Sequence, residues 1–465
     1  HLFNVFIHPG AGLILGPQAR VVIDGALFNE SDPEGFWLQA NENSHAMLIY
    51  SGVGHATIER YLTAADGKLG WTLFSTAVAD QPIVPEFFPG TFADNNNLLK
   101  WDEPTGNWIS AYITDNSWNP SFENSFIGGK GYMTSFSSEG IRTFKGFPFA
   151  WHTNIEIPNS GDVDKGWNLL ANPFPANYRW ELSDQNIGKI AKIWDNESAS
   201  FVDLYPGGII PALTGFMIQT QPGESLNYHF SEFMRTFDDS YIPGPGTRSI
   251  FLSVTESLTS TKQTCIIREG EPGSNGYNYY EDSRFLPGFA AQLYSLDGVE
   301  RLSTNTLPVF TSGNLIPLGF VKNDATDYSL EIQIPELYPG MLVNLHDIKT
   351  GEIHDLGVNP VYNFTADEGD DPNRFELFFA TVGVDENSTP SDFTCYSSGK
   401  TIYLKCTMPM NGAVIINSMT GKQLIRTKVN GENLVTIDGT KLAAGTYFVS
   451  LSDISGVMTK KVVLY

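Results

Sequence analysis

The sequence is poor in several kinds of residue, and each shortage excludes a class of protein. Only three cysteines occur in 465 residues, so a framework of disulfides cannot hold the fold together. No apolar run reaches about 18 residues, so the sequence predicts no membrane span. Charged residues make up only 17% of the chain, and helical periodicity is almost absent. Helical bundles and membrane proteins are therefore excluded.

Motifs of catalysis are also missing. The eight histidines are scattered, and neither a His-Glu-x-x-His motif nor paired Cys-x-x-Cys motifs occur. The sequence has no Gly-x-Ser-x-Gly elbow, P-loop or dinucleotide fingerprint. Glycoside hydrolases use a pair of carboxylates. With 52 acidic residues in the chain such a pair can always be proposed, so the number of acidic residues is no evidence for this activity. We expect a protein that is not an enzyme.

Positive charge is scarce, and its distribution is uneven. The net charge is −24. From residue 381 onward eight Lys and Arg face six Asp and Glu, which makes this tail about +2 and the remainder about −26. Such an acidic body repels nucleic acid and anionic membranes, so neither is expected as a partner. The acidity is typical of a soluble extracellular protein.

Gly (44) and Pro (27) are plentiful, and they separate many short runs of β-branched and aromatic residues. This pattern predicts an all-β protein of tandem antiparallel β-sandwich domains. In residues 1–60 the runs are only about four residues long, as in 12–15 and 19–23. They predict either solenoid-like rungs or an edge sheet on the next domain. Unpaired rungs would offer an edge for a neighbouring chain.

Residues 61–240 contain a diverged internal repeat. Three short matches occur in the same order, separated by 96, 93 and 84 residues. The matched segments are Gly70 to Leu73 with Gly166 to Leu169, Lys100 to Asp102 with Ile193 to Asp195, and Gly131 to Met133 with Gly215 to Met217. The repeat predicts two similar β-rich halves, packed either as one sandwich or as two small domains.

The later boundaries follow from composition. Two Pro and two Gly in residues 241–247 predict a linker. Residues 248–380 contain seven or eight apolar runs and predict a second sandwich. Around the turn at 349–352 we expect a polar hairpin that sets the two His-Asp pairs, His346-Asp347 and His354-Asp355, across from each other. Residues 381–465 form the last domain.

Two sets of residues are candidates for binding. Trp108 and Trp118 lie outside the matched segments and beside Asn, which makes them the better candidates for exposed glycan-binding rings. Asp367, Asp370, Asp371 and Asn373 place hard oxygen ligands in one loop, as Ca²⁺ prefers. Pro372 interrupts that loop, and a solvated acidic turn is the default interpretation. No other cofactor is expected.

The last 85 residues contain three motifs in a fixed order. A strand from Ala413 to Asn417 leads into 419–422, then comes 442–449 (Leu-Ala-Ala-Gly-Thr-Tyr-Phe-Val), and the basic strand 459–463 (Thr-Lys-Lys-Val-Val) follows. This stretch resembles the type A C-terminal sorting domain of proteins exported by the type IX secretion system of Bacteroidetes. The resemblance implies a C-terminal Ig-like β-sandwich and recognition by the secretion machinery. The residues that carry it are Gly421, Leu442, Gly445, Tyr447, Lys460 and Lys461.

The resemblance also implies a location. An exported precursor would have lost a signal segment before His1, and the protein would be secreted or held on the outer cell surface. Cys395 and Cys406 flank the turn at 397–400 and would not lie directly opposite each other, so either a bridge in an irregular register or two buried thiols are expected.

These observations predict a non-enzymatic structural or adhesive surface protein, which could assemble into a filament or surface layer. Homo-oligomer contacts would involve the N-terminal strands or the C-terminal domain. The alternative is a glycan-binding module or a glycan-active hydrolase, suggested by the Trp-rich acidic body.

Overall fold

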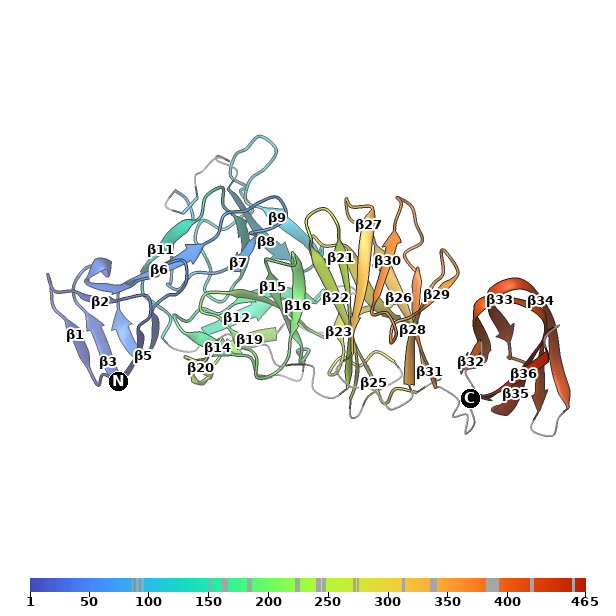
Figure 1. Ribbon diagram of the computed structural model, residues 1–465. Coiled ribbons are helices and arrows are strands. Elements are labelled where there is room, and N and C mark those ends of the chain that lie inside the picture. The colour runs from blue at the N-terminus through green and yellow to red at the C-terminus, as the bar shows by residue number, and fades with distance from the viewer. Residues whose placement is uncertain are drawn as a thin grey trace. The chain divides into compact units, whose positions relative to one another are not determined.

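The computed structural model consists of β-strands joined by loops, which confirms the all-β prediction (Figure 1). It describes residues 1–465 except 86, 89–91, 93–95, 151–152, 161–165, 182–185, 222–225, 240–243, 245–247, 271–272, 274–275, 312–313, 335–340, 382–392, 419–421 and 454–455. In the described ranges the only helical elements are two short 3₁₀ turns, η1 (Pro33–Gly35) and η2 (Glu232–Met234).

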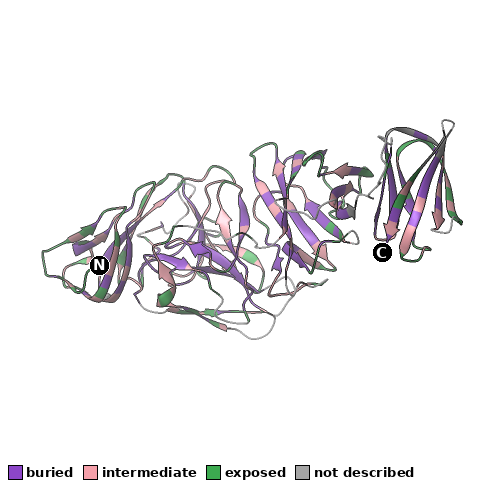
Figure 2. Ribbon diagram, turned by 60° about the horizontal axis from the view of Figure 1, so that its bottom comes forward, coloured by how far each residue is buried: buried purple, intermediate pink, exposed green. Residues whose placement is uncertain are grey.

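The chain divides into two compact units. The first contains His1–Gly246 together with Ser260–Gln263 and Asn278–Ala290, and the second contains the rest. Nearly all of the predicted linker 241–247 lies outside the described residues, and the finer domain boundaries stay predictions. In both units buried residues follow the strands, while exposed residues gather in the loops (Figure 2).

The N-terminal strands form a short solenoid. The odd-numbered strands make one parallel sheet in the order β1-β3-β5, and the even-numbered strands make a second in the order β2-β4-β6. Successive strands therefore alternate between two faces, and their apolar side chains meet in one core. The bounds are β1 (Val5–Ile7), β2 (Leu13–Leu15), β3 (Arg20–Asn29), β4 (Phe36–Leu38), β5 (Met47–Gly54) and β6 (Ala56–Leu62).

His45, just before β5, is held neutral inside this region. Burial, followed by the charges of Arg60 and Arg20, lowers its pKa to about 4. Its Nε2 atom has no hydrogen-bond partner among the described residues. The pKa of histidine in an unfolded chain is near 6.5. Between this pH and about 4, His45 is therefore protonated in the unfolded chain but neutral in the folded chain. Stability should therefore fall as the pH drops from about 6.5 towards 4.

We expect the solenoid to lose about 2 kcal/mol between pH 7.5 and pH 5, at 1.36 kcal/mol per unit. The measurement is hydrogen exchange of the amides in β5 and β6 at both pH values. His45→Gln should remove most of this pH dependence. The same loss in that variant would assign the effect to other groups.

The next strands form two similar sheets. Their orders are β7-β10-β8-β9 and β13-β18-β15-β16, so each sheet places its equivalent strands in the same sequence. Each is accompanied by an antiparallel pair, β6 with β11 and β12 with β19. The bounds are β7 (Thr72–Phe74), β8 (Asn97–Asp102), β9 (Asn107–Ser110), β10 (Tyr132–Ser135), β11 (Gly140–Gly146), β12 (Thr153–Ile157), β13 (Trp167–Ala171), β15 (Ala191–Asp195), β16 (Ser200–Leu204), β18 (Gly215–Gln219) and β19 (Leu226–Phe230).

A small sheet of order β17-β14-β20 completes the second half, from β14 (Asn177–Arg179), β17 (Ile209–Ile210) and β20 (Arg235–Thr236). The two four-stranded sheets share one apolar cluster, to which Leu73 and Met133 contribute from the first half and Leu169 and Met217 from the second. The halves therefore contact each other through this cluster, while each also contributes to a larger cluster of its own. The choice between one sandwich and two small domains stays a prediction. This strand-by-strand correspondence supports the internal repeat.

The second unit begins with one large sheet in the order β29-β28-β31-β26-β24-β25-β22-β21-β27-β30. Strand β23 belongs to the residues of the first unit. Alternate residues of strands such as β22 and β27 are buried, and they form a common core. The bounds are β21 (Ser249–Glu256), β22 (Lys262–Glu269), β23 (Ser283–Arg284), β24 (Gln292–Asp297), β25 (Glu300–Leu307), β26 (Leu315–Val321), β27 (Asp327–Gln333), β28 (Met341–Asp347), β29 (Glu352–Asp355), β30 (Val361–Thr365) and β31 (Phe375–Thr381).

The last domain has five strands and its own core. The long strand β33 pairs with β32 along its first half and with β35 along its second, while β34 follows it throughout and β36 pairs with β35. The bounds are β32 (Phe393–Ser398), β33 (Thr401–Ser418), β34 (Gln423–Asp438), β35 (Gly445–Asp453) and β36 (Gly456–Leu464).

The cysteines of this domain sit on neighbouring strands but out of register. Cys395 is opposite Leu404 and Cys406 is opposite Phe393, so the two are not directly opposed, as predicted. Both are buried, and neither forms a disulfide. Burial raises the pKa of the Cys395 thiol to about 12. Of the two expectations, buried thiols are the one the structure shows.

Candidate functional site

The segment from Leu442 to Tyr447 forms the entry into β35. The Leu442 main-chain N–H donates to the Gly439 carbonyl at 2.8 Å, and its carbonyl accepts from Lys400 Nζ at 3.2 Å. Tyr447 donates its hydroxyl to the Ala443 carbonyl at 2.7 Å. These bonds fix the turn, and the Tyr447 ring joins the core.

Gly445 starts β35 with φ +155°, at the limit of the region that favours glycine. Nothing lies within 4 Å of the place a Cβ would take, so the constraint comes from the backbone and not from crowding.

The two lysines of the last strand point to opposite faces. Lys460 is opposite Val449 and half-buried, while Lys461 is opposite Phe448 and exposed. Lys460 lies near Cys395, because its charge opposes the rise in that thiol's pKa. Lys461 is thus the member of the pair that is accessible to a partner. Gly421, the remaining predicted signal residue, lies outside the described part of the chain.

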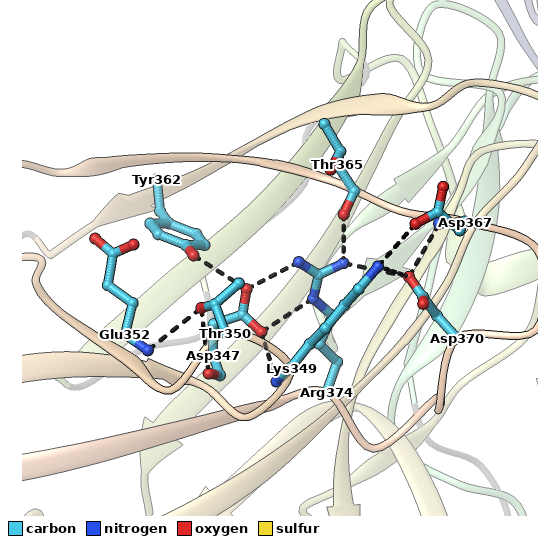
Figure 3. A network of polar contacts seen from close by, with 9 residues as sticks. All are labelled: Asp347, Lys349, Thr350, Glu352, Tyr362, Thr365, Asp367, Asp370 and Arg374. Atoms are coloured by element: carbon cyan, nitrogen blue, oxygen red, sulfur yellow. Dashed lines mark hydrogen bonds and ion pairs between the residues drawn. The ribbon is translucent and has the colours of Figure 1, made fainter.

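A second group of polar residues lies where β28, β30 and β31 meet (Figure 3). The Asp347 and Arg374 side chains are 1% and 3% exposed, and Asp347 Oδ2 is 2.8 Å from Arg374 Nη2. Asp347 also accepts from Arg374 Nε at 3.1 Å, from the Tyr362 hydroxyl at 3.0 Å and from the Lys349 main-chain N–H at 3.0 Å. Arg374 donates to the Thr365 carbonyl at 2.6 Å.

These contacts determine the charge of Asp347. Burial alone would raise the pKa of its carboxyl, but the Arg374 hydrogen bonds and charge, with help from Tyr362 and Lys349, hold the pKa below its usual value. Arg374 also lies against the Phe364 ring, 4.6 Å from its centroid. The group is therefore a satisfied structural network that ties the hairpin to the start of β31.

The acidic loop that was the calcium candidate lies beside this network. Lys349 Nζ is 3.0 Å from Asp367 Oδ2 and 2.8 Å from Asp370 Oδ2, so the chain's own ammonium group lies between these carboxylates. Asp371 instead accepts from the Asn373 main-chain N–H at 2.9 Å. Across the described residues no group of three or more His, Cys, Asp or Glu is placed to hold a metal ion. The calcium site stays a prediction that this geometry disfavours.

The hairpin itself forms at the predicted turn, but its register differs from the sequence interpretation. His346 pairs with Ile353 and His354 with Leu345, so the two His-Asp pairs are not opposite each other. His346 Nδ1 is 2.9 Å from Glu376 Oε2, and His354 Nε2 is 2.9 Å from the Asn359 carbonyl.

The two candidate tryptophans lie half-buried against cores. Trp108 is opposite Trp101 on β8, with ring centroids 5.2 Å apart. Trp194 and Phe201 form the matching pair in the second half, 5.1 Å apart. Trp108 lies outside the matched segments, but the corresponding strand pairs extend beyond those segments to β9 and β16. The sequence matches ended before these strands, where Trp is replaced by Phe.

Trp118 packs edge-on against Tyr112 and Phe122. Its Nε1 is buried and has no hydrogen-bond partner in the described residues. Glycan binding by Trp108 and Trp118 stays a prediction. Both side chains are half-buried and make edge-on contacts with aromatic neighbours.

Sequence and structure comparisons bear on the last domain. Residues 398–465 match the family model described as "Secretion system C-terminal sorting domain". No curated protein gives a significant match. One similar solved structure, a "Biofilm associated protein - BSP domain", shares 9% identity, with 88% of this chain and 95% of that chain covered at a TM-score of 0.18. A likeness this slight supports no argument.

The matched region includes the turn at Leu442, the β35 entry at Gly445 and the basic end of β36, which are the features that the sequence predicted. Within the described ranges no helix is long and apolar enough to cross a membrane. The chain is a cargo protein of the type IX secretion system, and its C-terminal sorting domain marks it for export to the extracellular space or the cell surface.

Proposed function

We propose that the exported protein is a non-enzymatic structural or adhesive component of the cell surface, which associates with copies of itself through the first rung of its solenoid. The strongest support for this proposal is the composition of the exposed side of the first rung, which consists of β1 and β2. Solenoid ends usually carry polar caps. Here the first rung exposes large apolar side chains.

Strands β1 and β2 are the end strands of their sheets. Phe3 is 75% exposed and Phe6 58% exposed, and Ile14 on β2 is 58% exposed. Phe6 stacks on Phe28, with ring centroids 5.2 Å apart. An unpaired strand edge flanked by apolar rings can accept a strand from another chain, and burying those rings would stabilise the contact.

Self-association should depend on these rings. For the double variant Phe3→Ser, Phe6→Ser we expect an association constant lower by at least about tenfold, because two exposed aromatic side chains lose their burial. Multi-angle light scattering over a range of concentrations gives the mass, and electron microscopy shows any filament or layer. Phe233→Ser is the matched control, since Phe233 is 84% exposed but lies on η2. A wild-type protein that is monomeric throughout would refute the proposal, as would unchanged assembly of the double variant.

The proposal also takes the chain to be without catalytic activity. The Asp347 network supports this part of the proposal, because Asp347 is hydrogen-bonded to Tyr362 and Arg374 and connects strands of the sheet. The alternative of a glycan-active hydrolase rests only on the number of acidic and aromatic residues.

A further inference from the structure

The first unit contains a small pocket that none of the predicted sites includes. Its volume is about 190 Å³. It is lined by the loop 41–46, by residues 58–61 of β6, and by Pro175 and residues 211–213 of the second half. Pockets for drug-sized ligands are about 300–1,000 Å³. This one therefore suits a single small molecule.

Arg60 provides the charge of this pocket. It occupies the same side of β6 as Ile58 and Leu62, which belong to the core, so its guanidinium points inward. Nη1 donates to the Ala212 carbonyl at 3.0 Å, and Nη2 donates to Thr214 Oγ1 at 3.2 Å. Burial lowers the pKa of Arg60 to about 10, which still leaves it charged at neutral pH.

No acid neutralises this cation within the described residues. Glu42 and Glu59 also line the pocket, but no ion pair joins either of them to Arg60 among the described residues. The Glu59 carboxylate accepts from Trp37 Nε1 at 3.0 Å and from the Ala40 main-chain N–H at 2.9 Å, and the Glu42 carboxylate accepts from Asn43 Nδ2 at 3.1 Å. His45, also in the lining, is neutral. Burying the Arg60 guanidinium with only neutral hydrogen-bond acceptors costs free energy. Its remaining N–H donors lie in one plane, in the geometry that binds a carboxylate.

The rim of the pocket supplies neutral polar groups. Asn41 Oδ1 accepts from the main-chain N–H groups of Asn43 and Ser44 at 2.9 and 2.8 Å, which fixes the loop. Asn43 and Ser44 line the pocket. Asn43 Nδ2 donates to Glu42 Oε1 at 3.1 Å and Ser44 Oγ donates to Asn41 Oδ1 at 3.3 Å, which leaves the second amide hydrogen and the amide oxygen of Asn43 and the hydroxyl oxygen of Ser44 for a ligand. Such groups bind hydroxyls, so the pocket combines one carboxylate receptor with several hydroxyl receptors.

We propose that this pocket binds a carboxylate-bearing sugar, such as a single uronic acid residue, with its carboxylate on the Arg60 guanidinium and its hydroxyls on the 41–44 loop. This site is independent of the sorting domain and of the solenoid's first rung. It gives the exported protein a ligand at the junction of the solenoid and the repeat.

Isothermal titration of the full chain tests this, with D-glucuronate, D-glucose and acetate as ligands. We expect glucuronate to bind at least about tenfold more tightly than glucose, which lacks the carboxylate, and more tightly than acetate, which lacks the hydroxyls. Arg60→Gln should weaken glucuronate binding at least about tenfold. Arg142→Gln is the matched control: Arg142 is directly opposite Arg60 on β11, but it lies over the Phe136 ring and outside the pocket.

Two further measurements cover the case in which Arg60→Gln does not fold. Arg60→Lys keeps the charge and loses the fork, so it should fold and bind glucuronate more weakly than the wild type. In the wild-type protein, bound carboxylate should raise the pKa of His45, observed by NMR of the imidazole. Absence of glucuronate binding to the wild type would overturn the proposal, as would equal affinity for glucose or binding unaffected by either Arg60 variant. Acetate binding as tight as glucuronate would overturn the assignment to a sugar.

Discussion

Removal of residues 382–465 should abolish export, leaving the protein inside the periplasm and none in the culture medium or on the cell surface. The expectation follows from the match of residues 398–465 to the sorting-domain family and from their folding around a core of their own. Immunoblotting of periplasmic, outer-membrane and extracellular fractions measures the outcome.

The matched control is the reciprocal transfer. A periplasmic reporter joined to residues 382–465 should leave the cell, whereas the same reporter joined to residues 248–381 should not. Export of the truncated chain would overturn the assignment of the sorting domain. Retention of both reporters would mean that the domain is not sufficient, although it is still required.

Breaking the buried pair between Asp347 and Arg374 should cause the largest loss of stability in the second unit. Asp347→Asn removes the hydrogen-bonded counter-charge of a guanidinium that is 3% exposed and leaves it only the Asp370 carboxylate, 3.7 Å away. Breaking a buried pair typically costs about 3–5 kcal/mol, and we expect a loss towards the lower end of that range. Hydrogen exchange of amides in β28 and β31 measures the loss. The double variant Asp347→Leu, Arg374→Met should recover part of it, because no charge is then left buried.

Lys349→Ala is the control, since it removes an ion pair from the same network at the surface, and we expect little change. The pH dependence has a definite sign. The pKa of Asp347 lies below its ordinary value in the folded chain, so its stabilisation is present above about pH 4 and is lost as the pH falls through the folded pKa. Asp347→Asn should lack that acid-induced loss, and a variant as stable as the wild type would show that the pair contributes nothing.

The sequence predicted the parts of this fold that depend on short runs of neighbouring residues. The four-residue apolar runs before residue 60 became solenoid rungs, because each run is long enough for one strand and is followed by a turn. The match of the segment around Trp71 with the segment around Trp167 identified equivalent strands of the two sheets, because both rings pack in the same apolar cluster. The terminal motifs identified the sorting domain because sequence and strand order coincide there.

Contacts between distant segments could not be predicted in the same way. Asp347 and Arg374 are 27 residues apart, and only the register of β28 with β31 brings them together. Arg60 gave no clear signal, because it follows Glu59 in a mixed segment, and its partners Ala212 and Thr214 lie in the other half of the repeat. The counterpart of Trp108 in the second half is Phe201, a substitution that preserves the packing and keeps this position outside the sequence matches.

The two repeated sheets pack against each other through a shared apolar cluster, much as two subunits of a dimer do, but they belong to one chain. Leu73 and Met133 of one half lie in the same apolar cluster as Leu169 and Met217 of the other, so neither half can bury that face alone. Separated from the other, either half would expose these side chains, so each half depends on a neighbour that the same chain supplies at a fixed ratio of one to one. Among the described strands the two halves differ in one addition, the small sheet of β14, β17 and β20 in the second half.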